Sequence, residues 1–287
     1  MLSVVIPSYN TAATLSQQLE ALAHQDPCPE PWEVVVSDNG STDDTLLVVE
    51  RYRSRLSRLT LVDASARRGA GFVRNMGVKA AAGDKLAFCD SDDLVAKDWV
   101  AKMSQALDRH NFVAGRMEGE RLNAPWILKT RQCPQEDGLQ PYHYPPFLPH
   151  AAACNLGVKR YWHDAVGGFD ESLPRLQDTD YCWRLQLMGV ELHYAPEVLV
   201  HYRFRESLSG MFRQARLWGE YNVLLYKRYQ AVGMPVLSWQ VGLTEWLSLL
   251  RQIRRIRNKT SYARWLWRLG WRLGRLYGSL KYQTFAL

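Results

Sequence analysis

The stretch LSVVIPSYN, residues 2–10, decides how the N-terminal part of the chain is expected to fold. Its β-branched run from Val4 to Ile6 predicts a buried strand, which Pro7 and the polar residues Ser8 to Asn10 bring to an end. Leucines at helical spacing then predict a helix over residues 14–24. A strand, a polar turn and a helix in this order form the first part of a βαβ unit, and therefore of a parallel sheet.

The same alternation continues through the first hundred residues. The patterns predict strands over residues 33–36, 59–62 and 85–89, and helices over residues 45–52 and 71–82. The polar clusters 8–10, 38–41 and 90–93 each follow one of these strands. Because ligands of parallel α/β sheets bind at the carboxyl ends of the strands, we expect the three clusters to meet in one crevice.

Regular patterns are weaker in the middle of the chain. Six prolines and several aromatic residues between positions 124 and 150 predict an irregular binding loop. We then expect a strand over 151–158, a turn at 167–170, a helix over 179–188, a strand over 191–194 and helices from about residue 208. The predicted organisation is an α/β domain over 1–205, with halves at 1–110 and 111–205, and a helical extension over 206–287.

Composition restricts the class of protein. With 287 residues, 47% of them apolar, the chain is an ordinary globular protein. Its five cysteines are scattered without a C-x-x-C pair, which argues against disulfides and a zinc site and favours a reducing compartment. Residues 201–287 hold 16 Lys and Arg against three Asp and Glu, so that they carry +13 while the first 200 residues carry −6. We expect no signal peptide, because no basic segment follows Met1.

The segment CDSDDL, residues 89–94, places Asp90, Asp92 and Asp93 directly after a predicted strand. A hard cation such as Mg²⁺ or Mn²⁺ takes carboxylate ligands together with phosphate oxygens, and an Asp-x-Asp turn can supply two. A solvated acidic turn would explain the same residues. The residues alone leave both explanations open for Asp90 and Asp92, and we expect Asp93 to cap the helix that follows.

Five segments in order carry a resemblance: VVIPSYNTAATL, VVVSDNGSTDDT, RRGAGFVRNMGVKAAAGDKLAFCDSDDL, VGGFDESL and QDTDYCWRLQLMG. Together they resemble the family 2 glycosyltransferases. The resemblance covers residues 2 to about 205. It implies a GT-A fold, which is Rossmann-like with a mostly parallel central sheet flanked by helices, here with a C-terminal helical extension. It also implies an enzyme that transfers a sugar from a nucleotide-diphosphate donor, with Mg²⁺ or Mn²⁺ as cofactor.

The resemblance also implies roles for individual positions. Asp38 corresponds to the acid that recognises the nucleoside, although a turn-forming Asp before Asn39-Gly40 would give the same sequence. Asp90 and Asp92 match the metal-binding DxD motif, and His201 is a further candidate ligand, although a lone His is more often structural. The implied donor-binding residues are Pro7, Tyr9, Asn10, Asp38, Asn39, Arg74, Asn75, Asp90 and Ser91.

The segment LQDTDYCWR contains the implied general base. Asp178 takes that role, with Asp180 and Arg184 in support, and the transfer is expected to invert the sugar. The sequence departs from the commoner family pattern at Gln177, where Glu is usual. A neutral neighbour removes a charge that would raise the pKa of Asp178. A helix N-cap at Asp178 is the structural alternative.

Residues 206–287 are basic and rich in tryptophan. Between residues 251 and 281 there are ten basic residues and no acid. Leucines from Leu266 to Leu280 cluster on one side of a helical wheel and arginines on another, which is typical of a helix that lies on a membrane surface. The apolar stretch 236–250 is too short to span a bilayer. Packing onto the acidic domain is the alternative, and the glycine stripe Gly270, Gly274 and Gly278 could seat another helix.

These features predict a cytoplasmic enzyme, peripheral on the inner face of the cell membrane, that acts on a glycan, polysaccharide or lipid-linked acceptor. No nucleic-acid-binding module is present, and a homo-oligomer is left open. Two alternatives remain. A nucleotidyltransferase would carry a Gly-rich phosphate loop after the first strand, which PSYNTAAT lacks. A non-catalytic sugar-nucleotide-binding or membrane-scaffold relative would keep the binding residues without turnover.

Overall fold

The computed structural model describes residues 1–286 and contains two compact units. The first unit comprises Met1–Arg121, Cys133–Gln140 and His150–Arg203. The second comprises Leu122–Gln132, Pro141–Pro149 and the described chain from Phe204 onward. The second unit therefore combines the C-terminal helices with two segments of the region that the sequence predicted to be an irregular loop.

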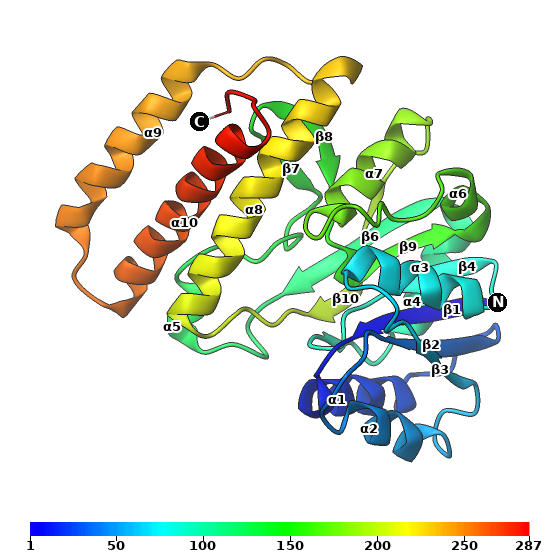
Figure 1. Ribbon diagram of the computed structural model, residues 1–287. Coiled ribbons are helices and arrows are strands. Elements are labelled where there is room, and N and C mark those ends of the chain that lie inside the picture. Colours follow the sequence, from blue (N-terminus) through cyan, green and yellow to red (C-terminus); the bar gives the residue numbers. More distant parts are fainter. Residues whose placement is uncertain (287) are drawn as a thin grey trace. The chain divides into compact units, whose positions relative to one another are not determined.

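An eight-stranded sheet forms the centre of the first unit, in the order β3-β2-β1-β4-β9-β6-β10-β5 (Figure 1). Neighbouring strands run parallel from β3 to β4, whereas β9 runs antiparallel between β4 and β6, and β5 runs antiparallel to β10. The strands are β1 (Leu2–Ser8), β2 (Trp32–Asp38), β3 (Leu59–Asp63), β4 (Lys85–Phe88), β5 (Leu94–Val95), β6 (Phe112–Glu118), β9 (Leu156–Lys159) and β10 (His193–His201).

Register places the predicted polar clusters side by side. Ser8 at the end of β1 pairs with Asp38 at the end of β2, and Asp38 pairs with Asp63 of β3. Val5 pairs with Phe88, so that Asp90 follows β4 near the end of β1. The predicted meeting of these strand ends at one edge of the sheet is confirmed.

Helices cover both faces of this sheet. Alternate side chains of a strand point to opposite faces, so that Val4 and Ile6 pack with α1, α2 and α4, whereas Val5 packs with α3 and α7. Because both faces of β1 are covered, its residues form a continuous apolar run, and this run was the basis for predicting the strand. The helices of this unit are α1 (Ala12–Ala23), α2 (Thr45–Tyr52), α3 (Ala70–Ala80), α4 (Trp99–Arg109), α6 (Arg160–Ala165) and α7 (Gln177–Leu187).

Some local predictions were wrong. The strand expected over 151–158 begins only at Leu156, because Ala153–Asn155 forms a 3-10 turn. The strand expected over 191–194 is the beginning of β10, which continues to His201 across an irregularity between Ala195 and Leu199. Asp93 does not cap a helix, because the short strand β5 follows it and α4 begins at Trp99.

The second unit is mainly helical. It contains α5 (Pro125–Leu128), α8 (Leu208–Tyr229), α9 (Trp239–Gln252) and α10 (Lys259–Lys281), and most of the hairpin formed by β7 (Gln140–His143) and β8 (Pro146–His150). The hairpin corrects the prediction of a wholly irregular loop over 124–150. Helix α10 lies between α8 and α9 (Figure 1). Within residues 1–286, we find no helix with the length and apolarity needed to cross a membrane.

Glycines allow α8 and α10 to approach closely. A Cβ atom on Gly274 would lie 2.0 Å from the backbone oxygen of Arg216, and one on Gly278 would lie 2.7 Å from that of Glu220. On α8, a Cβ on Gly219 would lie 2.2 Å from the backbone oxygen of Trp271. The stripe that the sequence singled out therefore seats α8 of the same chain.

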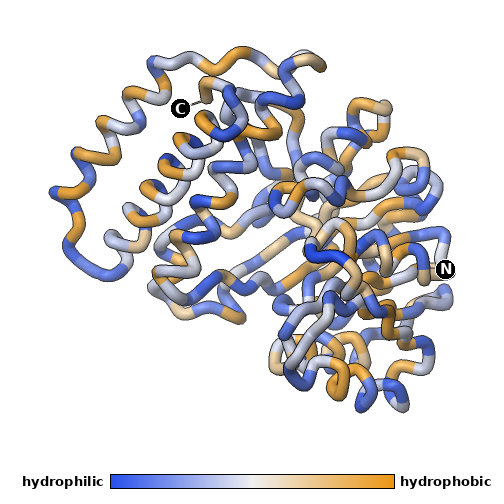
Figure 2. Tube along the Cα trace, in the orientation of Figure 1, coloured by the Kyte–Doolittle hydropathy of each residue, from blue (hydrophilic) through white to orange (hydrophobic). Residues whose placement is uncertain are grey.

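The arginines of α10 do not form one exposed face. Arg272 and Arg275 are buried, and both guanidinium groups lie near the ring of Tyr144, which they approach to 5.6 and 5.4 Å. Leu276 and Leu280 on the same helix are exposed instead. Hydropathy along the chain alternates through α9 and α10, as expected for helices with two different sides (Figure 2). Arg264 and Arg268 are exposed, so that only part of the predicted arginine face of α10 points outward, and its contact with a membrane stays a prediction.

Candidate active site

Asp38 closes a tight turn at the end of β2. Its Oδ2 accepts the backbone N–H groups of Gly40 and Ser41 at 2.9 and 2.8 Å, and its Oδ1 accepts the Ser41 hydroxyl at 2.5 Å. Gly40 has a φ of 77°, which a side chain would disfavour. The carboxylate is buried and already bonded, so that the turn-forming role is present in the structure and the nucleoside role stays a prediction.

The loop after β1 is joined to this turn. The Asn10 side-chain oxygen accepts the Thr42 N–H at 2.7 Å, and the Asn10 N–H donates to the Ser41 hydroxyl at 2.8 Å. Tyr9 is exposed at the surface, with the Arg68 guanidinium 4.3 Å from its ring centroid. A flat aromatic ring and a guanidinium at the strand ends form a surface on which a nucleobase could stack.

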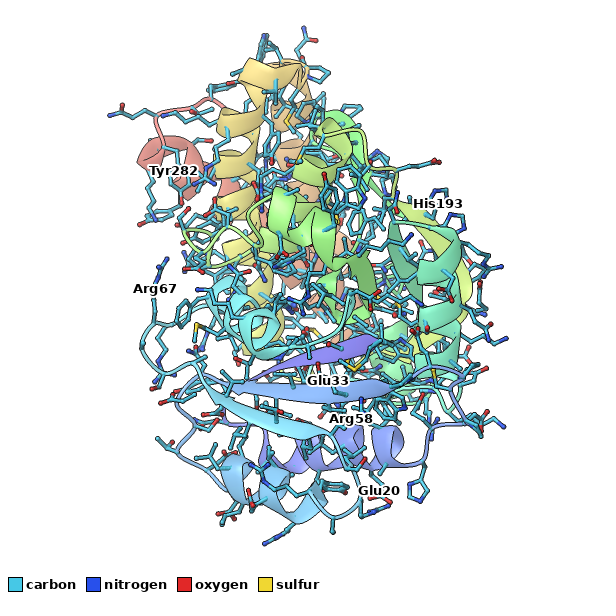
Figure 3. All side chains as sticks on the ribbon, turned by 90° about the vertical axis from the view of Figure 1, so that its right-hand side faces the viewer. Glu20, Glu33, Arg58, Arg67, His193 and Tyr282 are labelled. Atoms are coloured by element: carbon cyan, nitrogen blue, oxygen red, sulfur yellow. The ribbon has the colours of Figure 1, made fainter. Side chains whose placement is uncertain are left out.

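Asn39 and Asn75 hold neighbouring loops in place. The Asn39 amide donates to the carbonyl oxygens of Ala64 and Arg67 at 2.6 and 2.7 Å. The Asn75 amide donates to Phe169 O and to Glu171 Oε1, both at 2.9 Å, and its oxygen accepts the Phe169 N–H. Arg67, which projects from the loop before α3 (Figure 3), also pairs with Glu171, at 3.0 Å. These two asparagines therefore shape the edge of the site through the backbone.

Arg74 is the buried cation of the site. Its Nη2 donates to Asp90 Oδ1 at 2.5 Å, and its guanidinium lies 5.6 Å from the ring centroid of Phe169. Nε and Nη1 are buried and have no hydrogen-bond partner among residues 1–286. Buried donors without partners are costly, and a buried positive charge favours a negative charge nearby, here that of Asp90.

Ligand atoms of Asp90, Asp93 and Cys154 lie within 4.8 Å of one another. Asp93 Oδ1 accepts the Arg203 N–H at 2.8 Å, whereas its Oδ2 is buried without a hydrogen-bond partner in the described chain. Burial and the charges of Asp92 and Asp90 raise the pKa of Asp93 well above its usual value. Two close carboxylates and one unpartnered oxygen fit a hard divalent cation, which would also offset the repulsion between them.

The predicted ligands Asp92 and His201 lie outside this group. The Arg203 guanidinium donates to the Asp92 carbonyl oxygen at 2.9 Å, which fixes the backbone of the CDSDDL turn. His201 Nε2 lies 3.0 Å from Arg121 Nη1, and its Nδ1 contacts Glu118. Their roles as metal ligands stay predictions. Asp93 and Cys154 were not predicted as members of this group, because only the fold brings the turn Ala153–Asn155 beside the CDSDDL turn.

Asp178 lies in the first turn of α7. Its Oδ1 accepts the Thr179 N–H at 2.9 Å and its Oδ2 accepts the Ala153 N–H at 3.4 Å. Burial raises the pKa of Asp178, and the charge of Arg74 opposes that rise while the charge of Asp90 adds to it. Ala153 directly precedes Cys154, whose sulfur lies within 4.8 Å of the Asp90 carboxylate, so that Asp178 lies close to the Arg74–Asp90 pair. Leu176, just before the helix, has a left-handed backbone with a φ of 58°.

Asp180 and Arg184 stabilise the neighbouring turn. Arg184 Nε donates to Asp180 Oδ2 at 2.7 Å, and its Nη1 and Nη2 donate to Val166 O and Gly168 O, both at 2.8 Å. One guanidinium therefore ties α7 to the turn at residues 166–168, which leads to Phe169. The role of this pair in support of the base stays a prediction.

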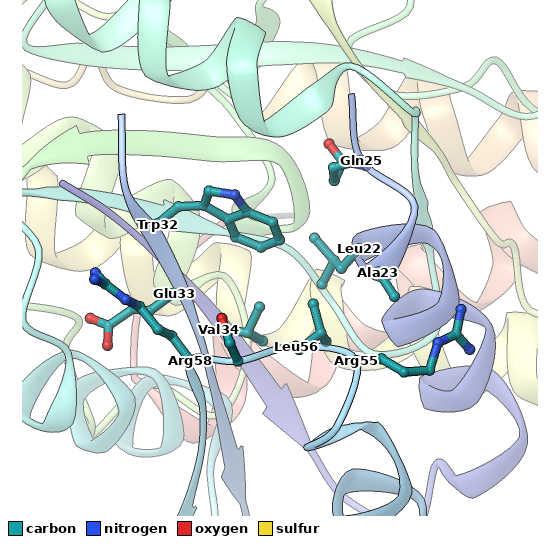
Figure 4. A pocket seen from close by; sticks show the side chains of 10 residues that line it. Leu22, Ala23, Gln25, Trp32, Glu33, Val34, Arg55, Leu56 and Arg58 are labelled. Atoms are coloured by element: carbon teal, nitrogen blue, oxygen red, sulfur yellow. The ribbon is translucent and has the colours of Figure 1, made fainter. Parts of the chain in front are cut away.

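A separate hollow lies at the other end of the sheet, at the amino ends of β2 and β3 (Figure 4). Trp32, Leu22 and Leu56 line it together with Arg55 and Arg58. It contains none of the carboxylates described above. The arrangement that can support chemistry is the one at the carboxyl ends of the strands.

The fold and these residues place acidic and basic groups together at one edge of an α/β sheet. The sequence profile of the family described as "Glycosyl transferase family 2" matches residues 3–167, which is more than half of the chain. The chain therefore belongs to this family.

Two curated relatives illustrate the likeness. Validoxylamine A glucosyltransferase of Streptomyces hygroscopicus subsp. limoneus is 41% identical over 230 residues, which are 69% of this chain and 50% of that protein. The poly(ribitol-phosphate) beta-N-acetylglucosaminyltransferase TarS of Staphylococcus aureus (strain Mu50) is 37% identical over 109 residues, which are 38% of this chain and 19% of TarS. The matches thus span half or less of these relatives.

Solved structures share the fold. The mannosyltransferase PcManGT from Pyrobaculum calidifontis, in complex with GDP-Man and Mn²⁺, has a TM-score of 0.67 at 18% identity and covers 96% of this chain and 87% of its own. S. aureus TarS 1-349 in complex with UDP-GlcNAc has a TM-score of 0.55 at 18% identity, covering 100% and 93%. At this identity the likeness establishes the GT-A fold that the sequence predicted.

Proposed function

We propose that the protein is a glycosyltransferase that moves a sugar from a nucleotide-diphosphate donor to an acceptor hydroxyl with inversion. The observation that supports this most directly is the position of Asp178. Its carboxylate accepts the N–H of Ala153, the neighbour of Cys154, which lies with Asp90 and its partner Arg74 at the strand ends of a family 2 fold. Such a transfer requires a proton acceptor next to groups that bind the diphosphate. Asp178 would be the acceptor, and Arg74 and Asp90 would serve the diphosphate.

In the proposed reaction, Asp178 accepts the proton of the acceptor hydroxyl while that oxygen attacks the anomeric carbon. The bond from that carbon to the diphosphate breaks, and the leaving diphosphate takes the bonding electrons. Attack from the side opposite the leaving group inverts the anomeric centre. The raised pKa of Asp178 makes its carboxylate a better proton acceptor than an exposed aspartate.

Arg74 and the carboxylates serve the other side of the reaction. The positive charge of Arg74 would stabilise the diphosphate, where negative charge develops. Asp90 and Asp93 fit a divalent cation, and Asp92 is the further ligand that the DxD pattern predicts. Mg²⁺ or Mn²⁺, when bound, would supply positive charge that stabilises the leaving diphosphate.

The donor loops would hold the nucleoside. Tyr9 and Arg68 offer a stacking surface beside the turn of Asp38, and Asn10 and Asn39 keep that turn in place. PcManGT was solved with GDP-Man and Mn²⁺ and TarS with UDP-GlcNAc, which supports a nucleotide sugar as the donor class. For the acceptor we propose a glycan or a lipid-linked hydroxyl, at a membrane surface.

A binding screen and a base variant test this proposal. Thermal shift with a panel of nucleotide-diphosphate sugars, with and without Mn²⁺, should show stabilisation by one donor that grows when the cation is present. Asp178→Asn should keep this stabilisation but lose about 10²- to 10⁴-fold in transfer, because general base catalysis contributes that much. Asp26→Asn, an exposed acid on the same unit, is the matched control.

Three results would contradict the proposal. Transfer that is unchanged in Asp178→Asn would exclude this residue as the base. Activity that survives EDTA and Asp90→Ala would exclude the cation. Donor binding without turnover on any acceptor extract would favour the alternative of a non-catalytic sugar-nucleotide-binding protein.

A further inference from the structure

Helix α9 carries an apolar face that nothing in the described chain covers. Trp239 and Leu250 are each 59% exposed, Leu243 is 52% exposed and Leu247 is 43% exposed. At about 100° per residue, these four side chains fall within an arc of about 80° on the helix. We call Trp239, Leu243, Leu247 and Leu250 the α9 face.

The other side of the same helix faces α10. Leu249 and Gly242 are buried there, and Glu245 Oε2 pairs with Arg272 at 2.9 Å and with Arg268 at 3.5 Å. The Trp265 indole N–H of α10 donates to the Leu249 carbonyl oxygen at 3.1 Å. Helix α9 therefore turns Glu245 and Gly242 toward α10, and the α9 face points away from α10. Single exposed leucines are ordinary, but a contiguous apolar helix face marks an interaction surface.

Exposed cations follow this face directly. Arg251, Arg254, Arg255, Arg257 and Lys259 are all exposed. No acidic residue follows Glu245 in the sequence to neutralise them. An apolar helix face with a tryptophan at one end and a cluster of cations at the other matches a surface that binds both acyl chains and phosphate headgroups.

We propose that the α9 face binds the surface of an anionic lipid bilayer. The helix would lie in the plane of the interface, with the α9 face toward the acyl chains and the cations of residues 251–259 on the lipid phosphates. At 14 residues α9 is about 21 Å long, which is too short to cross the hydrocarbon core. The expected membrane contact thereby moves from α10, where Arg272 and Arg275 are buried, to α9.

A second copy of the chain explains the surface less well. A dimer through the α9 face would bury its leucines, but it would add a second set of cations to the seam without an acid after Glu245 to offset them. An anionic bilayer uses both the apolar and the charged part. Lipid binding can be measured without any donor or acceptor, so that its outcome is independent of the proposed glycosyl transfer.

Flotation of the full chain with lipid vesicles tests the proposal. Wild-type protein should float with vesicles of phosphatidylcholine mixed with phosphatidylglycerol, and far less with phosphatidylcholine alone. Leu243→Asp/Leu250→Asp should weaken this binding about tenfold or more. The matched control is Leu47→Asp on α2, where the leucine is 56% exposed, and this variant should float like wild type.

Charge variants separate the two parts of the surface. Arg254→Gln/Arg255→Gln should weaken binding about fivefold per arginine and reduce its dependence on salt. Arg51→Gln/Arg58→Gln, two exposed arginines of the first unit, is the control and should leave binding unchanged. As a second measurement, brominated lipid should quench tryptophan fluorescence in wild type, and less so in Trp239→Phe.

Several outcomes would overturn the proposal. The proposal is wrong if wild-type protein does not float with the anionic vesicles. It is also wrong if Leu243→Asp/Leu250→Asp floats like wild type. If the protein binds phosphatidylcholine vesicles as strongly as vesicles with phosphatidylglycerol, the cations of residues 251–259 do not contribute to binding. A concentration-dependent dimer in light scattering that Leu243→Asp/Leu250→Asp dissolves, without flotation of wild type, would assign the face to a second copy instead.

Discussion

Replacing Gly274 by Ala should destabilise the helical unit, even though alanine is the better helix former. The new Cβ would lie 2.0 Å from the Arg216 carbonyl oxygen, 2.8 Å from its carbonyl carbon and 2.9 Å from the Glu220 nitrogen. All three atoms belong to the backbone, so that no side chain can rotate away. Ordinary contact begins at 3.4 Å, and α8 and α10 would have to separate by roughly 1.4 Å at this point.

The magnitude follows from two opposing terms. Alanine instead of glycine inside a helix gains about 1 kcal/mol of helix propensity. Overpacking costs about 1–3 kcal/mol where side chains can adjust, and more where they cannot. Separation would also loosen the contacts at Gly219 and Gly278 along the same seam. We therefore expect a net loss of about 2 kcal/mol or more in the free energy of unfolding of this unit.

Urea unfolding followed by tryptophan fluorescence would measure the change, because most tryptophans of the chain lie in this region. Gly233→Ala is the control in the same unit, since Gly233 has a φ of 98° and a Cβ added there would meet no heavy atom within 4 Å. That variant tests backbone strain without a clash and should cost about 1 kcal/mol. A Gly274→Ala protein at least as stable as wild type would refute the close approach of α8 and α10.

Three further changes probe the catalytic unit. Arg184→Ala removes the bonds to Asp180 and to the 166–168 turn, and should lower the urea midpoint by the equivalent of about 3 kcal/mol. Asn75→Ala frees the segment at Phe169 and should raise the donor KM more than it lowers kcat, which initial-rate kinetics would separate. Gln177→Glu should move the acidic limb of the kcat profile to higher pH, and an unmoved limb would exclude Asp178 as the titrating base.

Much of the first unit follows from local pattern. The strand ends at Ser8, Asp38 and Asp90 are marked by apolar runs that stop at polar residues, and parallel pairing then requires them to share one edge. The family motifs lie on these ends. Asp93 and Cys154 could not be predicted together, because they approach only after β9 has inserted antiparallel beside β4.

The helical unit shows a different limit of sequence analysis. A helical wheel of α10 separates leucines from arginines, but it does not say which side meets a neighbour. The glycine stripe and α8 decide that question, because only small residues admit the α8 backbone. Arg272 and Arg275 follow the glycines inward and leave Leu276 and Leu280 exposed. The amphipathic pattern was present, but its orientation required the partner helix.

Gln177 shows how one departure from a family pattern fits its surroundings. The side chain is buried next to Asp178, at the N-terminal end of α7. A carboxylate at this position would be a second buried negative charge near Asp178 and would raise its pKa further. Burial already raises that pKa, and Arg74 acts in the opposite direction. With a neutral Gln177, Asp178 releases its proton at a lower pH than it would beside a glutamate. As the proposed base, Asp178 would therefore be ionised over a wider range of pH, at the cost of being a weaker proton acceptor.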